Sequence, residues 1–287
     1  MLEKSYPAKI IVLGEYTVLS GSRALVVPYG DFSGRWSFVD KNNESSGILK
    51  SFCDHKLDHL IHLDTLKKDL DKGLWFDSNI PQGYGVGSSG ALIAAIFDVY
   101  GKSSQKILEL KETLGRMEDF FHGSSSGIDP LVSYLEKPII IENASEVEVL
   151  KTKPSMDGFF LVNTNRPRHT GKLIEIYREK MKDAQFKKGC AEILSRDVNF
   201  AIDCLLKNDK EHLFHHLWHI SKFQWDFFPE MIPTQMRNLW ARGIESGDYV
   251  LKLCGAGGGG FLLGYSEKLS NDELIQVFEP HDLRELK

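Results

Sequence analysis

The chain has 287 residues, of which 42% are hydrophobic and 26% are charged, and its formal net charge is −5. This length allows one large domain or two ordinary ones, and we expect two lobes. The mild negative charge gives no electrostatic footprint for nucleic acid or for an anionic membrane, so we expect neither as a partner.

The cysteines and the apolar runs point to a cytoplasmic protein. No CxxC pair occurs, so the pattern indicates neither a zinc site nor a disulfide framework, and we expect reduced, mostly buried thiols. The apolar run Ile10–Leu13 is too short for a secretory signal, and no other run approaches membrane-spanning length. The cysteines are Cys53, Cys190, Cys204 and Cys254.

The first segment predicts two paired strands, Lys9–Leu13 and Ala24–Pro28, with a turn at Gly21 and Ser22 between them. Residues 40–79 are polar and read as irregular, except for a helix-like stretch that stops at Gly73.

Two helices follow. A glycine-rich loop runs into an apolar helix, Ser88–Tyr100, with Gly101 as its C-terminal stop. Apolar residues at helical spacing between Ile107 and Phe121 predict the second helix, which ends at Gly123 before a loop.

A strand near Gly158 follows a polar linker, so we place a lobe boundary near Pro154 and divide the chain into lobes 1–153 and 154–287. Helices are predicted over about Lys172–Ser246, and two strands joined by glycines come after them. Strands and helices mix without regular alternation, which indicates an α+β fold rather than a doubly wound sheet.

The first glycine loop predicts an anion site. Ser88 and Ser89 stand where the loop becomes a helix, and unpaired N–H groups and the positive end of the helix dipole converge there. Glycines let a phosphate approach the backbone, and the serine hydroxyls can reach a phosphate oxygen or its magnesium. The loop is not a Walker A motif, because no Gly-Lys-Ser/Thr closes it, and since a single motif carries a real false-positive risk, a tight turn before a buried helix is an equal alternative. The glycines are Gly83, Gly85, Gly87 and Gly90.

The second glycine cluster, residues 255–260, has five glycines in six positions. Each costs roughly 0.5–1 kcal/mol relative to alanine in a regular element. We interpret the cluster as a backbone that a ligand approaches closely, and the alternative is a flexible hairpin tip.

Three charged residues are candidates for chemistry, although none of them is decisive alone. Helical periodicity turns Glu118 inward, where a carboxylate needs a cation or hydrogen-bond donors, and taken by itself a salt-bridged structural role is the commoner explanation. Asp129 lies in a loop of small residues before Pro130 and could be a turn residue or a helix N-cap. Lys9, at the start of an apolar strand, could be a solvated strand end.

Four histidines at three- and four-residue spacings suggest a metal site on one helix face. Apolar residues interleave with them, so a packed helix is the favoured interpretation. The histidines are His212, His215, His216 and His219.

Five ordered segments resemble the GHMP kinase superfamily and, within it, the mevalonate kinases. They are PAKIIVLGEYTVLSGSRALV, IPQGYGVGSSGALIAA, EDFFHGSSSGIDPLVS, LVNTNRPRHTGKLI and KLCGAGGGGFLLG.

The resemblance implies a fold and an activity. The fold would be an N-terminal lobe like ribosomal protein S5 domain 2 and a ferredoxin-like C-terminal lobe. The activity would be transfer of the γ-phosphoryl of ATP, with Mg²⁺, to a hydroxyl of a small molecule, here mevalonate in isoprenoid precursor synthesis. A homodimer is one option that the sequence leaves open.

The resemblance also implies roles. Asp129 would be the catalytic base and Lys9 would sit beside the acceptor hydroxyl, while Ser89 and Glu118 would hold magnesium. The first glycine loop, with Ser88, would bind ATP. The acceptor side would comprise Glu15, Tyr16, Arg168, Thr170, Gly255, Ala256, Gly257 and Gly258.

The chain departs from the family pattern at Tyr16, where a histidine is usual, and at Ser124-Ser125, Pro130 and Phe261. The alternatives are a phosphomevalonate kinase, a sugar kinase, a diphosphomevalonate decarboxylase-like protein, and a sensor that binds nucleotide or metabolite without turnover. A sensor would be expected to lack one of the three charged residues, and all three are present.

Overall fold

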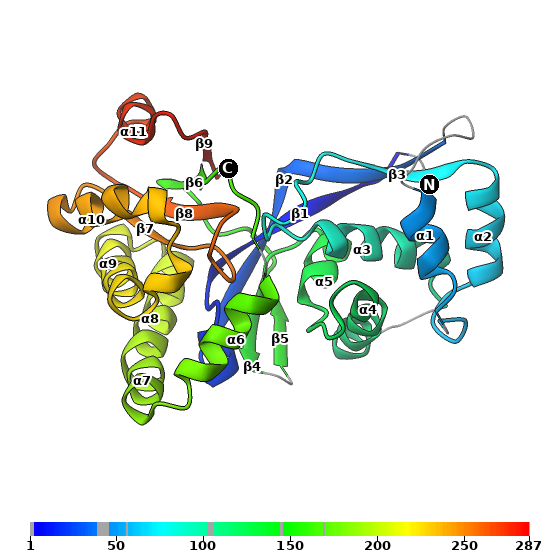
Figure 1. Ribbon diagram of the computed structural model, residues 1–287, viewed down its shortest axis with the longest axis horizontal. Helices are drawn as coiled ribbons and strands as arrows, with labels where there is room; N and C mark the ends of the chain where they lie inside the picture. The colour runs from blue at the N-terminus through cyan, green and yellow to red at the C-terminus, as the bar shows by residue number, and fades with distance from the viewer. Residues whose placement is uncertain are drawn as a thin grey trace. The chain divides into compact units, whose positions relative to one another are not determined.

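The computed structural model describes residues 3–38, 46–55, 57–102, 106–143, 146–168 and 170–286. These residues divide into two compact units (Figure 1). Unit 1 comprises residues 1–9, 27–81 and 86–138, and unit 2 comprises residues 10–26, 82–85 and 139–287. Each unit is assembled from separate stretches of chain, and the predicted lobe boundary near Pro154 stays a prediction.

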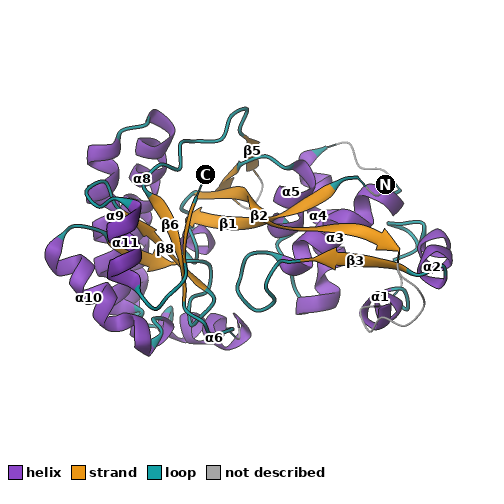
Figure 2. Ribbon diagram, turned by 90° about the horizontal axis from the view of Figure 1, so that it is seen from above, coloured by secondary structure: helices purple, strands orange, loops and turns teal. Residues whose placement is uncertain are grey.

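The first sheet has the strand order β1-β2-β4-β5, with β3 also paired to β2. In unit 1, residues 34–38 of β2 run antiparallel to residues 74–78 of β3 (Figure 2). In unit 2, residues 24–26 of β2 pair with residues 139–141 of β4. The strands are β1 (Ser5–Leu13), β2 (Ala24–Phe38), β3 (Leu74–Ser78), β4 (Ile139–Asn143) and β5 (Glu146–Val149).

Helix α3 is the centre of the helical layer in unit 1, because it contacts both α4 and α5 (Figure 1). Most of its side chains between Ala91 and Tyr100 are buried, whereas Asp98 is exposed. The helices of this unit are α1 (Ser46–Phe52), α2 (Leu63–Asp71), α3 (Ser88–Tyr100), α4 (Ile107–His122) and α5 (Ile128–Leu135).

The second sheet lies in unit 2 and has the order β7-β8-β6-β9, all antiparallel. Helices α9 and α10 pack against β7, and α11 contacts β9. The strands are β6 (Phe159–Asn163), β7 (Val250–Leu253), β8 (Phe261–Tyr265) and β9 (Leu283–Glu285). The helices are α6 (Thr170–Lys180), α7 (Ala184–Gly189), α8 (Ser195–Lys207), α9 (Lys210–Phe227), α10 (Arg237–Ser246) and α11 (Asn271–Phe278). Four short turns of helix complete the unit: η1 (Thr17–Ser20), the π-helical η2 (Cys190–Leu194), η3 (Pro229–Met231) and η4 (Thr234–Met236).

The α+β prediction is confirmed, and so are several elements. Helix α3 has the predicted bounds and stops at Gly101, while α4 ends at Gly123, whose φ of 69° is left-handed. The strands on either side of the second glycine cluster pair with each other as β7 and β8. Glu118 is buried, as the helical periodicity predicted.

Three expectations were wrong. Residues 40–79 are not irregular throughout, because α1 and β3 form there. Pro28 does not end the second strand, which continues to Phe38. Asp129 does not lie in a loop: it is the second residue of α5, and Pro130 is the third. Proline is tolerated there because the first N–H groups of a helix have no intrahelical partner.

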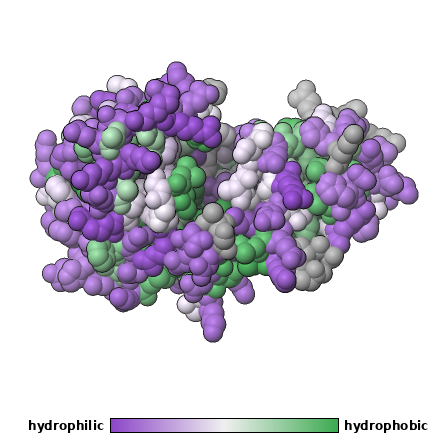
Figure 3. All heavy atoms as spheres, turned by 90° about the horizontal axis from the view of Figure 1, so that it is seen from below, coloured by the Kyte–Doolittle hydropathy of each residue, from purple (hydrophilic) through white to green (hydrophobic). Residues whose placement is uncertain are grey.

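The cysteines are free and buried, as predicted. No helix in the described ranges is both long and apolar enough to cross a membrane. On the face drawn in Figure 3, hydrophilic residues cover most of the surface and hydrophobic residues appear only in patches.

Candidate functional site

The centre of the site in unit 1 is an ion pair between Lys9 and Asp129. Lys9 lies in β1, and its backbone N–H donates to the carbonyl of Val86 at 2.9 Å. Its Nζ lies 2.9 Å from Asp129 Oδ1, with the lysine side chain 4% exposed and the aspartate side chain 30% exposed. The buried lysine is therefore not a solvated strand end, and the carboxylate is the accessible member of the pair.

The glycines before and inside α3 allow this pair to form close to the helix N-terminus. Gly87 precedes α3 with a φ of +80°, and a Cβ there would lie 2.9 Å from Lys9 Cγ. A Cβ on Gly90 would lie 2.8 Å from Asp129 Cβ. Both contacts are tighter than packed side chains accept, so the glycines bring the start of α3 against both charged residues.

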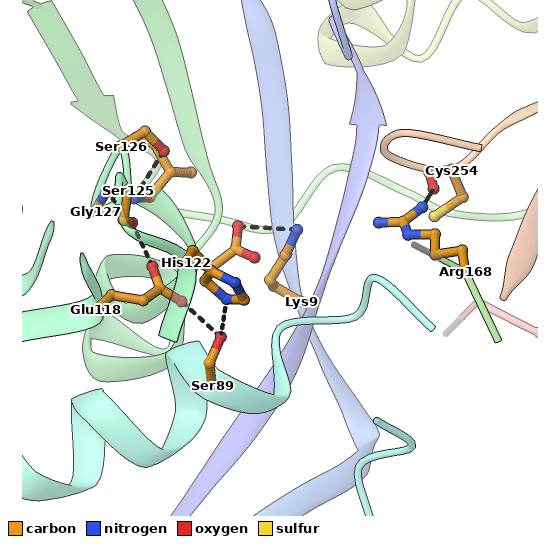
Figure 4. Close-up of polar contacts among 11 residues, drawn as sticks. Lys9, Ser89, Glu118, His122, Ser125, Ser126, Gly127, Arg168 and Cys254 are labelled. Carbon is orange, nitrogen blue, oxygen red and sulfur yellow. Dashed lines mark hydrogen bonds and ion pairs between the residues drawn. The ribbon is translucent and has the colours of Figure 1, made fainter. Parts of the chain in front are cut away.

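Ser89 lies in the first turn of α3 and contacts Glu118 on α4. Its Oγ donates to Glu118 Oε1 at 2.8 Å, and the other carboxyl oxygen, Oε2, accepts from Ser125 Oγ at 2.5 Å (Figure 4). The backbone N–H of Ser125 donates to Asp119 Oδ1 at 2.6 Å. The structure thus brings together four residues that the sequence singled out, which are Lys9, Ser89, Glu118 and Asp129.

Burial dominates the electrostatics of Glu118. Removal from water, and then the nearby charge of Asp129, raise its pKa from 4.5 to about 7. Hydrogen bonds from Ser125 and Ser89, and the charge of Lys9, lower the pKa but do not offset the burial. A cation placed beside this carboxyl would stabilise its ionised form.

His122 is a neighbour of this site that we did not predict. It ends α4, and its Nε2 lies 2.9 Å from Ser89 Oγ. The signal in the sequence is its spacing, because residues four apart lie on the same face of a helix and Glu118 precedes His122 by four.

In unit 2, Glu15 belongs to a buried charged network. Its Oε1 lies 2.7 Å from Lys252 Nζ and accepts from Gln224 Nε2 at 2.9 Å. Lys252 also donates to the carbonyl of Leu253 at 2.7 Å. Burial raises the pKa of Glu15 and Lys252 opposes the rise. Lys252 was not predicted, although a lysine in the middle of an apolar strand was a signal that could have found it.

Tyr16 is also held within unit 2. It has a φ of 65°, and its hydroxyl donates to the carbonyl of Ala256 at 2.7 Å. Its ring lies 4.5 Å from that of Tyr177 and 5.7 Å from that of Phe228, between ring centroids. The side chain is 7% exposed.

Arg168 packs where glycines leave room for it. Its backbone N–H donates to the carbonyl of Gly83 at 2.9 Å, and its Nη1 donates to the carbonyl of Cys254 at 2.6 Å (Figure 4). A Cβ on Gly85 would lie 1.8 Å from Arg168 Nη2, and one on Gly255 would lie 2.7 Å from it. The side chain of Thr170, predicted beside Arg168, lies outside the described residues.

The glycines of residues 255–260 have a third explanation besides a ligand and a flexible tip. All five have positive φ. A Cβ on Gly257 would lie 2.8 Å from the carbonyl oxygen of Met231, and one on Gly260 would lie 2.5 Å from that of Tyr84. The loop is packed against its own unit, so the chain itself requires glycine here.

The histidines of α9 favour the structural interpretation. His216 Nδ1 lies 2.9 Å from Asp197 Oδ1, and the His216 ring stacks on Phe200. His212 Nδ1 lies 2.9 Å from Asp209 Oδ2, at the N-cap of the helix. Within the described part of the chain, no group of three or more His, Cys, Asp or Glu side chains converges to hold a metal ion.

A family comparison matches residues 51–137 to the GHMP kinases N terminal domain. Among curated proteins, the mevalonate kinase of Pyrococcus abyssi is 26% identical to this chain over 298 aligned positions, covering 89% of this chain and 86% of the relative.

Solved structures share the fold at lower identity. The Streptococcus pneumoniae phosphomevalonate kinase in complex with phosphomevalonate and AMPPNP has a TM-score of 0.70 at 14% identity, covering 99% of this chain and 98% of that one. The L. major mevalonate kinase in complex with R-mevalonate has a TM-score of 0.65 at 17% identity, covering 99% and 95%. The two-lobed fold is therefore confirmed.

Proposed function

We propose that this protein transfers the γ-phosphoryl of ATP to a hydroxyl of a small metabolite, because residues 51–137 match the GHMP kinases N terminal domain and a solved phosphomevalonate kinase shares the fold of the whole chain. The observation that carries the proposal is the Lys9–Asp129 ion pair, whose lysine is buried and whose carboxylate is partly exposed. A base and a cation held this close suit the activation of a hydroxyl.

The residues beside α3 fit the binding of a nucleotide phosphate. Ser88, Ser89 and Gly90 form the first turn of α3, where backbone N–H groups lack helical partners. That turn attracts an anion through these groups and through the helix dipole. Gly87 and Gly90 present no side chains to exclude a phosphate.

The donor set also fits Mg²⁺. Ser89 Oγ and Glu118 Oε1 lie 2.8 Å apart, and both are oxygen ligands, which this hard cation prefers. Glu118 is a buried carboxyl in the field of Asp129, so a cation would relieve its unfavourable charge. When bound, Mg²⁺ would supply charge neutralisation on the phosphate oxygens.

The remaining chemistry belongs to the chain's own groups. Asp129 accepts the proton of the acceptor hydroxyl as that oxygen forms its bond to the γ-phosphorus, and the bond from phosphorus to the leaving ADP oxygen breaks. Lys9, 2.9 Å from Asp129, stabilises the negative charge on the attacking oxygen.

Mevalonate is the proposed acceptor, and the P. abyssi mevalonate kinase supports it because the similarity extends over 89% of this chain. The proposed acceptor-side residues lie in unit 2, and they are Glu15, Tyr16, Arg168, Thr170 and Gly255–Gly258. Phosphomevalonate is the second candidate, since a phosphomevalonate kinase shares the fold.

The test is ADP release from ATP and Mg²⁺ by the purified protein with mevalonate, phosphomevalonate, galactose and homoserine. We expect turnover with mevalonate that Asp129→Asn lowers by about 10²–10⁴-fold. Turnover with phosphomevalonate alone would show that the proposed acceptor is wrong and that the proposed kinase activity is right. Nucleotide binding without turnover on any acceptor would favour the sensor alternative.

A further inference from the structure

We propose that His122 is a positioning residue: by donating its Nε2–H to Ser89 Oγ, it directs the Ser89 hydroxyl proton toward Glu118 and leaves one serine lone pair free for a cation. His122 Nε2 lies 2.9 Å from Ser89 Oγ, and that same oxygen lies 2.8 Å from Glu118 Oε1 (Figure 4). The inference rests on the proposed function, because it concerns the proposed Ser89–Glu118 cation site.

Counting protons leads to this assignment. A serine hydroxyl has one proton and two lone pairs, and an ionised carboxylate only accepts hydrogen bonds. When Glu118 is ionised, as a cation ligand must be, the Ser89 proton therefore points at Oε1. The contact to His122 then requires a proton on Nε2, and it uses one lone pair of Ser89 Oγ. The second lone pair remains for a cation.

The other oxygen of Glu118 has the same arrangement with a backbone donor. Ser125 Oγ accepts from the N–H of Gly127 at 3.0 Å and donates to Glu118 Oε2. A backbone N–H can only donate, so the direction of the Ser125 hydroxyl is fixed. His122 Nε2–H donates to Ser89 Oγ in the same way that the Gly127 N–H donates to Ser125 Oγ. The two hydroxyls hold Glu118 in one orientation.

The geometry of α4 makes His122 available for this role. It is the last residue of the helix, four positions after Glu118, and Gly123 turns the chain away with a left-handed φ of 69°. The side chain of His122 is exposed, so its loss should leave the core intact. A matched pair of variants can therefore separate the hydrogen bond from packing.

The experiment compares His122→Leu, which has no donor, with His122→Gln, whose amide keeps one. Mn²⁺ with a non-hydrolysable ATP analogue is titrated by electron paramagnetic resonance, so that the readout is binding rather than turnover. Loss of a group that orients a metal ligand typically weakens metal binding about 10–100-fold, and we expect H122L near the lower end. H122Q should bind like the unsubstituted protein.

Equal Mn²⁺ affinity in H122L and the unsubstituted protein would overturn the role of His122 and leave the proposed kinase standing. A protein that binds no Mn²⁺–nucleotide in any form would overturn the proposed function together with this inference. A second measurement needs neither ligand. The ¹⁵N chemical shifts of His122, identified by their loss in H122Q, should show a protonated Nε2 at pH 8, and a bare Nε2 would contradict the assignment.

Discussion

Lys9 Nζ lies 2.9 Å from Asp129 Oδ1, yet the lysine side chain is 4% exposed and the aspartate side chain 30%. The cation is thus fixed by its surroundings, while the carboxylate at the start of α5 retains access to solvent. A base needs that access to receive a proton.

Asp129→Asn removes the base and keeps the shape of the side chain. General base catalysis contributes about 10²–10⁴-fold, so kcat should fall by that factor with whichever acceptor the unsubstituted protein phosphorylates. Binding of an ATP analogue should persist, because the first turn of α3 is untouched. Asp64→Asn, at an exposed aspartate in the same unit, is the control and should retain its kcat.

Glu118 makes stability fall as pH rises. Its pKa is about 7 in the folded chain against 4.5 for the free side chain, so the folded state binds the extra proton. Without metal, the free energy of unfolding should therefore decrease between pH 4.5 and 7, by roughly 3 kcal/mol from this group alone. Urea unfolding at a series of pH values measures it.

Glu118→Gln should remove that part of the pH dependence, whereas Glu112→Gln, at an exposed position of the same helix, should not. With Mg²⁺ present the metal competes with the proton on Glu118. Apparent Mg²⁺ affinity should then weaken as pH falls below about 7. An apparent Mg²⁺ affinity that does not change between pH 5 and pH 8 would show that Glu118 is not a ligand of the cation.

Lys252→Met should destabilise the chain strongly, because it leaves Glu15 buried without its cation. Breaking a buried pair by removing one partner costs about 3–5 kcal/mol. Adding Glu15→Gln should recover much of that loss, since the uncompensated charge disappears. A double-mutant cycle in urea measures the coupling, and additive losses would show that the 2.7 Å contact contributes nothing.

Gly85→Ala should displace the Arg168 guanidinium, because the new Cβ would lie 1.8 Å from Nη2. Gly21→Ala is the matched control: Gly21 also has a positive φ, 94° against 74°, but nothing lies within 4 Å of its Cβ. The control measures backbone strain alone, about 1 kcal/mol. Gly85→Ala should lower the melting temperature more than Gly21→Ala does. Equal decreases in melting temperature would show that the guanidinium moves aside without an energetic cost.

The sequence predicted the elements with strong local patterns. Apolar periodicity, together with the glycine that follows each helix, was sufficient to predict α3 and α4. The same periodicity predicted that Glu118 is buried. Helix α5 was missed because Pro130 resembles a turn signal, although a proline fits the first turn of a helix.

Partners distant in sequence could not be predicted from local pattern. Gln224 reaches Glu15 across 209 positions, and Tyr16 reaches the carbonyl of Ala256 across 240. Such contacts depend on how the elements pack, which no spacing rule encodes. The need for glycine in residues 255–260 belongs to the same class, since it arises from close backbone neighbours such as Met231 and Tyr84.

Gly127 couples the two acidic residues mechanically. A Cβ there would lie 2.0 Å from the carbonyl oxygen of Lys111 in α4, and the N–H of Gly127 also holds Ser125, which contacts Glu118. The start of the helix that bears Asp129 is thus packed closely against the helix that bears Glu118. A side chain introduced at position 127 would push these two helices apart and so change the distance between the Glu118 and Asp129 carboxyl groups.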